Sequence, residues 1–497
     1  MTNTHDTDVI ICGAGASGLT LAIDLARRGV QFVLVDKAAG PFMGSRGKGI
    51  QPRTQEIFED LGVVDRVVAA GGTYPLQRNY TDDGPVDTAV MVRDEPTPDE
   101  PYKVPLLVPQ FLTERQLRGR LVELGHAPRY RHQLFGFDRD ETGVRAGVTT
   151  PDGAQTLRAR YLIGADGGSS FVRKTLGVDF PGRTLGVRAV VADVHAEGVT
   201  FDAWHYWRQG TPEQVSLCPL YGTDMFQLQG PVPFGVDIDV SAEGLTALLR
   251  ERTKRDDLVV RSVSWGSVYE MNARLADTFR VGRVFLVGDA AHTHPPTGGQ
   301  GLNTSVQDAY NLGWKLAAVL AGAADTLLDT YERERRPVAQ AMLGLTEHLL
   351  DAARGGDTRR DRKVNQLDLA YDGSPLNLHS KAGALVQPGH RAPDAPLTGA
   401  GGSMNRLFRL FQGTHWTLLG FEVGGDAVPA PRAGLHIHTI GPSGDLRDTY
   451  GFFHEAYELD RGQWVLVRPD GHLAGVADTA DLTELLNHLD GLGVRAP

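Results

Sequence analysis

The sequence predicts an α/β protein whose first domain has a Rossmann-type fold. Residues 8–37 follow the order strand, glycine turn, helix and second strand. Two later segments, residues 160–177 and 282–316, each run from a short apolar strand to an acidic residue and then into a helix. The chain has 497 residues, more than one compact core holds, so two or three domains are expected.

The charged-residue content of the chain argues against some classes of binding partner. The chain carries 50 Lys and Arg against 61 Asp and Glu, a formal net charge of -11. No basic excess is available to pair with phosphates, which argues against nucleic acid or an anionic membrane as the partner. The N-terminus lacks a signal-peptide pattern, and charges interrupt the longest apolar helical stretch, residues 312–328. The sequence therefore predicts a cytoplasmic protein without a membrane span.

Cysteine and histidine usage predicts no metal site. The only cysteines, Cys12 and Cys218, cannot form a disulfide framework, a CxxC pair or a cysteine-based zinc site. Cys12 falls within the first apolar strand and is expected to be packed. The pair His292 and His294 has no third ligand nearby in the sequence, so a packed or solvated histidine is expected at each position.

The first motif is "DVIICGAGASGLTLAIDLARRGVQFVLVDK", from residue 8 to residue 37. Gly13 permits the tight turn, Gly15 lets a pyrophosphate approach the backbone, and Gly18 lets the helix pack on the strand. Asp36 ends the second strand, where a carboxylate can hold ribose hydroxyls and would repel the extra phosphate of NADP. An ordinary glycine-rich turn would not need Asp36, so the motif favours a site for FAD or NAD.

The other two segments place an acidic residue directly after a strand. "RYLIGADGGSSFVRKTLG" contains Asp166, followed by a helix that Ser169 and Ser170 open. "GRVFLVGDAAHTHPPTGGQGLNTSVQDAYNLGWKL" contains Gly288 and Asp289, followed by a loop of prolines and glycines before a helix. The loop leaves backbone uncovered by side chains, as close approach of a ligand requires.

Together the three segments resemble the fingerprints of the class A flavin monooxygenases, the single-component FAD-dependent aromatic hydroxylases. The GxGxxG motif is the first, Asp166 and Gly167 match the DG motif, and Gly288 and Asp289 match the GD motif. "PPTGGQGLNTSVQDAYNLGWKL" resembles the flavin-ring loop of that family, with Ser305 where glycine is expected.

The resemblance implies roles for individual residues. In "SRGKGIQPRTQEIFEDLG", Arg46 would lie near the isoalloxazine and influence flavin position, which makes it the candidate catalytic residue. Gln110 would lie near the FAD phosphates, Asp36 replaces the more usual glutamate at the ribose, and Asp289 would accept a hydrogen bond from the ribityl chain. The implied cofactor-binding residues are Gly13, Gly15, Ser17, Gly18, Asp36, Lys37, Arg46, Gln110, Asp166, Gly288, Asp289, Pro296, Gly299, Gly301, Leu302 and Asn303.

The region between the DG and GD motifs reads as strands with one helix at "SAEGLTALLRERT". In the family this region is a sheet that covers the reactive face of the flavin and binds the aromatic substrate. Trp204 and Tyr206 alternate onto one face of their predicted strand. The candidate substrate residues are Trp204, Tyr206, Tyr221, Phe226, Tyr269 and Pro295. For each aromatic residue the alternative is a place in the core of the sheet. No general base stands out, because "GIQPRTQEIF" lacks the acid expected of a phenol-hydroxylase base.

The predicted domains are a discontinuous FAD-binding domain over residues 1–183 and 281–375, a substrate-binding sheet domain over 184–280, and a C-terminal domain over 376–497. The last resembles the thioredoxin-like domain of the phenol-hydroxylase branch, although "HLAGV" departs from the aromatic ending expected there. It contains no cysteine, so a structural or oligomerising role is expected instead of a redox role.

The resemblance implies an FAD-dependent monooxygenase that hydroxylates a phenolic or polycyclic polyketide-type aromatic compound. NADPH or NADH would bind transiently and reduce FAD, O2 would add as co-substrate, and the resulting C4a-hydroperoxyflavin would attack the ring. A monomer or homodimer is expected. A Baeyer–Villiger monooxygenase of the same fold and a non-catalytic FAD-fold binding protein remain as alternatives, whereas a flavin halogenase would need a WxWxIP segment that the sequence lacks.

Overall fold

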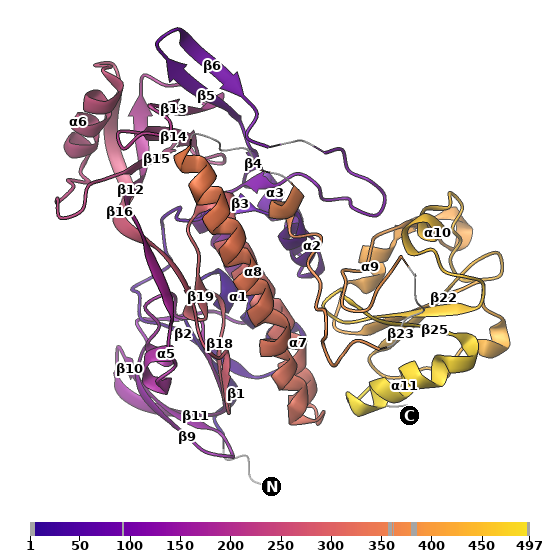
Figure 1. Cartoon of the computed structure of the whole chain (residues 1–497). Coiled ribbons are helices and arrows are strands. Elements are labelled where there is room, and N and C mark those ends of the chain that lie inside the picture. The colour runs from indigo at the N-terminus through magenta and orange to yellow at the C-terminus, as the bar shows by residue number, and fades with distance from the viewer. Residues whose placement is uncertain (1–4, 92–93, 356–359, 361, 379–384, 495–497) are drawn as a thin grey trace.

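The computed structural model describes residues 5–91, 94–355, 360, 362–378 and 385–494. Figure 1 shows one sheet at the lower left, a second sheet at the upper left and a separate C-terminal body at the right. The long helices α7 (Gly301–Leu320) and α8 (Asp329–Arg354) lie between them. Side chains from these two helices reach all three parts of the molecule.

The first sheet has the order β17-β18-β11-β1-β2-β8. Its parallel centre consists of β18 (Val284–Leu286), β11 (Gly153–Gly164), β1 (Thr7–Cys12) and β2 (Phe32–Asp36). β8 (Arg129–Tyr130) and β17 (Arg280–Val281) lie at the edges, while β9 (Gln133–Arg139) and β10 (Val144–Thr150) extend β11 as antiparallel strands. Because β2, β11 and β18 are parallel, the acidic residues that end or follow them meet at one edge of the sheet. The predicted α/β fold class is confirmed.

Helices and a small sheet flank this first sheet. The helices are α1 (Ala16–Arg27), α2 (Pro52–Asp60), α3 (Val64–Ala69), α4 (Gln110–Glu123) and α5 (Phe171–Leu176). The small antiparallel sheet consists of β3 (Gly49–Ile50), β7 (Leu106–Leu107) and β4 (Gly72–Thr73). Short 3-10 turns are η1 (Gly288–Ala290), η2 (Thr297–Gly299), η3 (Asp325–Leu328), η4 (Arg362–Asn365), η5 (Ala400–Gly402), η6 (Gly425–Ala427) and η7 (Thr479–Asp481).

The second sheet has the order β19-β16-β12-β15-β14-β13-β5-β6. It contains β12 (Gly182–Glu197), β13 (Ala203–Trp207), β14 (Val215–Pro219), β15 (Phe226–Pro231) and β16 (Val259–Leu275), with α6 (Ala242–Thr253) packed on it. It also takes β5 (Leu76–Thr81) and β6 (Gly84–Thr88) from the early part of the chain, and β19 (His292–Thr293) from the segment after the GD motif. This sheet therefore extends beyond the segment 184–280, because β5 pairs with the distant β13.

The C-terminal body has a four-stranded sheet in the order β23-β22-β24-β25. β22 (Trp416–Phe421) and β23 (Leu435–Ile440) are parallel, whereas β24 (Gln463–Val467) and β25 (Leu473–Asp478) form an antiparallel hairpin beside β22. This is the strand order of a thioredoxin-like fold. The short strands β20 (Pro396–Thr398) and β21 (Met404–Arg406) and the helices α9 (Leu407–Phe411), α10 (Phe452–Tyr457) and α11 (Leu482–Gly491) complete it.

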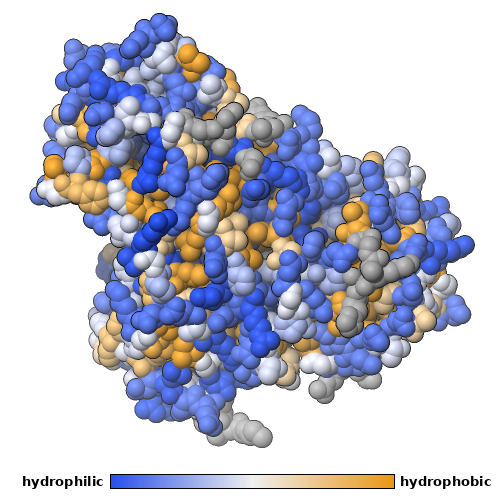
Figure 2. Space-filling view, viewed as in Figure 1, coloured by the Kyte–Doolittle hydropathy of each residue, from blue (hydrophilic) through white to orange (hydrophobic). Residues whose placement is uncertain are grey.

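The face of the molecule seen in Figure 2 is largely hydrophilic. Figure 2 shows hydrophilic residues over most of one face, with apolar residues gathered along its middle beside α8. Among the described helices, none is both long enough and apolar enough to cross a membrane.

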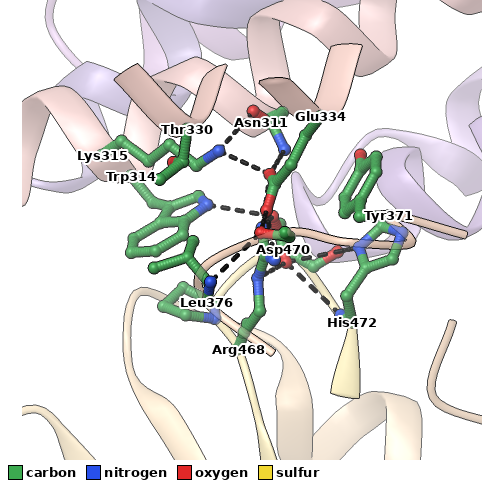
Figure 3. Close-up of polar contacts among 12 residues, drawn as sticks. Asn311, Trp314, Lys315, Thr330, Glu334, Tyr371, Leu376, Arg468, Asp470 and His472 are labelled. Carbon is green, nitrogen blue, oxygen red and sulfur yellow. Dashed lines mark hydrogen bonds and ion pairs between the residues drawn. The ribbon is translucent and has the colours of Figure 1, made fainter. Parts of the chain in front are cut away.

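A buried network of charged groups joins the C-terminal body to α7 and α8 (Figure 3). Arg468 donates to both carboxylate oxygens of Glu334 at 2.7 and 2.9 Å and to Asp470 at 3.1 and 2.6 Å. Lys315 donates to Glu334, and the Trp314 indole N–H donates to Asp470 at 3.0 Å. These side chains are withdrawn from solvent, so each charge depends on its partners for compensation.

We predict that Arg468→Met lowers the free energy of unfolding by about 3–5 kcal/mol, because Glu334 and Asp470 would keep buried negative charge without their shared cation. Urea unfolding of the full chain would measure this change. Arg461→Met is the control: Arg461 is 81% exposed and pairs with Glu422 at 3.4 Å, so a loss under about 1 kcal/mol is expected. Equal losses in the two variants would contradict the role given to the network.

Candidate active site

The glycine turn after β1 combines tightly packed backbone with open space. Gly13 has φ +109, and a Cβ there would lie 2.2 Å from the Ala165 carbonyl oxygen. A Cβ on Gly18 would lie 1.9 Å from the Gly13 carbonyl oxygen. A Cβ on Gly15 would instead meet nothing nearer than Glu114 Oε1 at 3.8 Å. The turn therefore leaves room in front of the N-terminus of α1, where backbone N–H groups can bind an anion.

Two of the three predicted acidic residues hold backbone N–H groups at the edge of the sheet. Asp36 accepts hydrogen bonds from the N–H groups of Ala14 and Ala38, each at 2.8 Å. One oxygen of Asp166 accepts from the first N–H groups of α5 at 2.7 and 3.1 Å. The other oxygen, Asp166 Oδ1, is buried and has no hydrogen-bond partner in the described part of the chain, as expected of an atom that awaits a ligand. Lys37 is exposed at the end of β2.

The third acidic residue lies in the turn formed by Gly288 and Asp289. Gly288 has φ +61, and a Cβ there would lie 2.8 Å from Ser305 Oγ and 3.0 Å from Ser17 Oγ, so this turn is close to both helices α1 and α7. Asp289 has solvent-accessible area, yet the surrounding protein removes enough hydration to raise its pKa. Both observations fit a carboxyl group that lines an internal space.

A buried carboxylate that the sequence did not single out fixes this turn. Asp308 accepts hydrogen bonds from the Gly288 N–H at 3.1 Å, from His292 Nε2 at 2.6 Å and from Arg335 Nε at 2.8 Å. The side chains of Asp308, His292 and Arg335 have no exposed area. His292 and Arg335 hold the pKa of Asp308 below its usual value despite burial. Asp308 lies inside the segment 282–316, but its partner Arg335 is distant in the sequence. The sequence also left open whether His292 is packed or solvated, so no sequence signal identified the role of Asp308.

The loop before α7 is fastened to the segment at residues 49–51. Asn303 donates to the carbonyl oxygens of Gly49 and Gly299 at 2.8 and 2.6 Å and accepts from the Gln51 N–H at 2.8 Å. Gln51 also donates to the Gly298 carbonyl oxygen at 2.9 Å. Asn303 thus holds the loop in place through all of its amide group. Of the remaining predicted loop residues, Pro295 is buried, Pro296 is exposed, and Gly301 and Leu302 begin α7.

Two further predicted residues, Gln110 and Arg46, come from earlier segments of the chain. Gln110 accepts a hydrogen bond from the Gly47 N–H at 3.1 Å and donates to Glu114 at 2.8 Å. Burial raises the pKa of Glu114 to about 7. Arg46 is exposed, and its guanidinium carbon lies 5.3 Å from the ring centre of Phe42.

The candidate substrate residues divide between two faces of the second sheet. Trp204 and Tyr206 share one cluster with Tyr221 packed against it, as their alternation along β13 predicts. Phe226 belongs to the other face, where it packs with α6 and contacts Phe201 at a ring distance of 4.4 Å. Tyr269 lies on β16, partly buried, and burial raises its pKa to about 12.

Comparison with known families identifies the chain. A family model described as an FAD-binding domain matches residues 6–346, and one described as the C-terminal domain of aromatic-ring hydroxylases matches residues 386–492. The chain belongs to the FAD-dependent aromatic-ring hydroxylases. It is therefore an enzyme, an FAD-dependent monooxygenase, and the fingerprints that suggested this family from the sequence identified it correctly.

Full-length relatives support the same assignment. A flavin-dependent monooxygenase of Mycobacteroides abscessus is 40% identical over 480 residues, covering 95% of this chain and 97% of that protein. A 12-dehydrotetracycline 5-monooxygenase/anhydrotetracycline 6-monooxygenase of Streptomyces rimosus is 32% identical over 517 residues, covering 95% of each chain. The crystal structure of a ternary complex of aklavinone-11 hydroxylase with FAD and aklavinone superposes with a TM-score of 0.83 at 29% identity, covering 99% of this chain and 100% of that one.

We predict that Gly18→Ala weakens FAD binding about tenfold or more, since the new methyl group would overlap the Gly13 carbonyl oxygen and force α1 away from the turn. Titration of the apoprotein with FAD would measure the dissociation constant. Gly344→Ala in α8 is the matched control, because no atom lies within 4 Å of its Cβ and alanine favours the helix. Normal FAD affinity in Gly18→Ala would contradict the role of this turn.

Proposed function

We propose that the enzyme uses NADPH or NADH and O2 to hydroxylate a polycyclic phenolic compound at an aromatic ring beside bound FAD. The observation that carries this proposal is that the flavin-ring loop lies beside an aromatic wall formed by the side chains of Tyr74, Trp204 and Tyr206. A Cβ on Gly299 would lie 4.0 Å from the Tyr74 hydroxyl oxygen, and one on Gly49 would lie 2.5 Å from it. Tyr74 belongs to the same buried cluster as Trp204 and Tyr206.

The residues around the turn suit FAD. Gly15 and the start of α1 would receive the pyrophosphate, Asp36 the ribose, and Asp166 Oδ1 a hydroxyl or amide donor. Asp289 would accept from the ribityl chain, while the loop fastened by Asn303 would support the ring. Bound FAD would supply the electron transfer and oxygen activation of the reaction, and the protein would orient the substrate and exclude water.

The names of the relatives support a large substrate. The Streptomyces rimosus relative is named for 12-dehydrotetracycline and anhydrotetracycline, and the aklavinone-11 hydroxylase was crystallised with aklavinone. Both names denote polycyclic compounds. In this chain the aromatic wall places the rings of Trp204 and Tyr206 5.2 Å apart and those of Tyr74 and Trp204 6.4 Å apart, a surface on which flat fused rings can stack.

The proposal is tested by the visible spectrum of the purified protein and by consumption of NADPH and NADH with a panel of polycyclic phenols that includes anhydrotetracycline. Oxidised-flavin bands, and consumption that each accepted phenol stimulates, are expected. Mass spectrometry of the products should show one added oxygen on an aromatic ring. Insertion of oxygen beside a ketone would instead identify Baeyer–Villiger oxidation, and no product with any phenol would contradict the proposal.

We predict that Arg46→Ala lowers kcat/KM for the accepted phenol by about tenfold, because Arg46 would no longer restrain the flavin and small misplacements of reacting groups are costly. Product formed per NADPH consumed should fall in the same assay. Arg461→Ala is the control, since Arg461 is an exposed arginine of the C-terminal body. Unchanged flavin reduction and unchanged product yield in Arg46→Ala would remove Arg46 from the mechanism.

A further inference from the structure

Lys48 lies between the flavin-ring loop and the aromatic wall. Its carbonyl oxygen accepts a hydrogen bond from the Val108 N–H at 2.7 Å, which fixes the backbone beside β3. The neighbouring Gly47 faces α7 and α4, because a Cβ there would meet Leu302 at 3.6 Å and Gln110 at 3.7 Å. The Lys48 side chain instead reaches the second sheet, with Nζ 4.2 Å from the centre of the Trp204 ring.

The amino group of Lys48 has a neutral hydrogen-bond partner. Nζ donates to Gln227 Oε1, and Gln227 Nε2 donates to the backbone and hydroxyl oxygens of Ser45. The Ser45 hydroxyl in turn donates to Asp193 Oδ1. Gln227, Ser45 and Asp193 are buried, so this chain of hydrogen bonds positions Lys48 without a direct ion pair.

Two polar atoms beside this chain have no hydrogen-bond partner among the described residues. They are the indole N–H of Trp204, whose ring faces Lys48, and Oδ2 of Asp193. Trp204 Nε1 can donate to an oxygen of a ligand, and Asp193 Oδ2 can accept from one. A buried polar atom without a hydrogen-bond partner calls for an explanation, and a bound ligand supplies one for both atoms.

A positive charge on Lys48 would be poorly compensated by the protein. No carboxylate of the described chain lies within ion-pair distance of Nζ, and loss of hydration lowers the pKa of Lys48. The other charged or titratable groups that face it are the Cys218 thiol, the Arg360 guanidinium and Asp193. Lys48 is partly buried, and withdrawing a cation from water is costly without an anion nearby, so the site is suited to a ligand that provides one.

We propose that Lys48 receives the hydroxyl group of a phenol or enol substrate and holds it as the anion against the Trp204 ring. In its deprotonated form Nζ takes the hydroxyl proton: the substrate O–H bond breaks, an N–H bond forms, and an ammonium–phenolate pair results. Ionisation makes the ring electron-rich, and hydroxylation needs such a ring. This inference rests on the proposed function and names the substrate feature that the site recognises.

The probe is 1,8-dihydroxyanthraquinone, whose phenolate absorbs at longer wavelength than its phenol. It is titrated into the oxidised FAD enzyme without NADPH at a series of pH values. We expect the bound probe to ionise about 1–3 pH units below its free value. Lys48→Met should abolish this shift and weaken binding at neutral pH about tenfold or more. The dimethyl ether of the probe cannot ionise, so Lys48→Met should change its affinity less than twofold.

Lys48→Arg gives a second readout that does not depend on the stability of Lys48→Met. Arginine keeps the charge but cannot take a proton at neutral pH, so hydroxylation of the accepted phenol should fall about 100-fold there. The rate should recover as the pH approaches the pKa of the free phenol, because the substrate then arrives as the anion. A wild-type pH profile in Lys48→Arg would overturn the proposal.

The remaining outcomes separate this inference from the proposed function. Equal loss of affinity for the phenol and its ether in Lys48→Met would show a structural role and overturn the inference. Failure of the wild-type enzyme to bind the phenol as its anion would also overturn it. If the phenolate band depends on Lys48 but no hydroxylated product forms, the anion site stands and the proposed function is refuted. Product formation with an unchanged band in Lys48→Met would refute the inference alone.

Discussion

One buried carboxylate joins the parts of this enzyme that must meet around the cofactor. Asp308 on α7 holds the Gly288 N–H of the turn after β18, His292 on β19 and Arg335 on α8. β19 pairs with β16 of the second sheet, so the same carboxylate links both large sheets. Since buried charges are costly unless each is compensated, these elements can pack together only in the arrangement that satisfies all of them.

The next residue along α8 extends this arrangement to the C-terminal body. Glu334, beside Arg335, binds Lys315 of α7 and Arg468 of the C-terminal body (Figure 3). Helix α8 therefore presents opposite charges to the two networks at adjacent positions. The C-terminal body, which contains no cysteine, has a structural role through this contact. Its Arg468 compensates the buried negative charge of Glu334 on α8.

The contrast between filled and open glycine positions explains how a rigid framework leaves room for a ligand. Backbone atoms fill the space beside Gly13 and Gly18, whereas the space in front of Gly15 stays open. Asn303 uses its whole amide group to fasten the flavin-ring loop to residues 49–51. Lys48 lies next to that fastened segment and turns toward the aromatic wall. The same short segment thus supports the proposed flavin site on one side and the proposed substrate site on the other.

The sequence by itself determined the FAD-type βαβ unit, the three acidic positions and the family. These features follow from glycine spacing and short apolar strands, which are patterns among residues close together in the chain. It also predicted that Trp204 and Tyr206 share a face, which follows from the two-residue period of a strand. Only the tertiary structure decided the partners of Asp308, the place of Phe226 on the opposite face, the entry of β5 and β6 into the second sheet, and the position of Lys48. These features join residues far apart in the chain, and the free energy of burying a charge or an aromatic ring depends on neighbours that local sequence patterns do not specify.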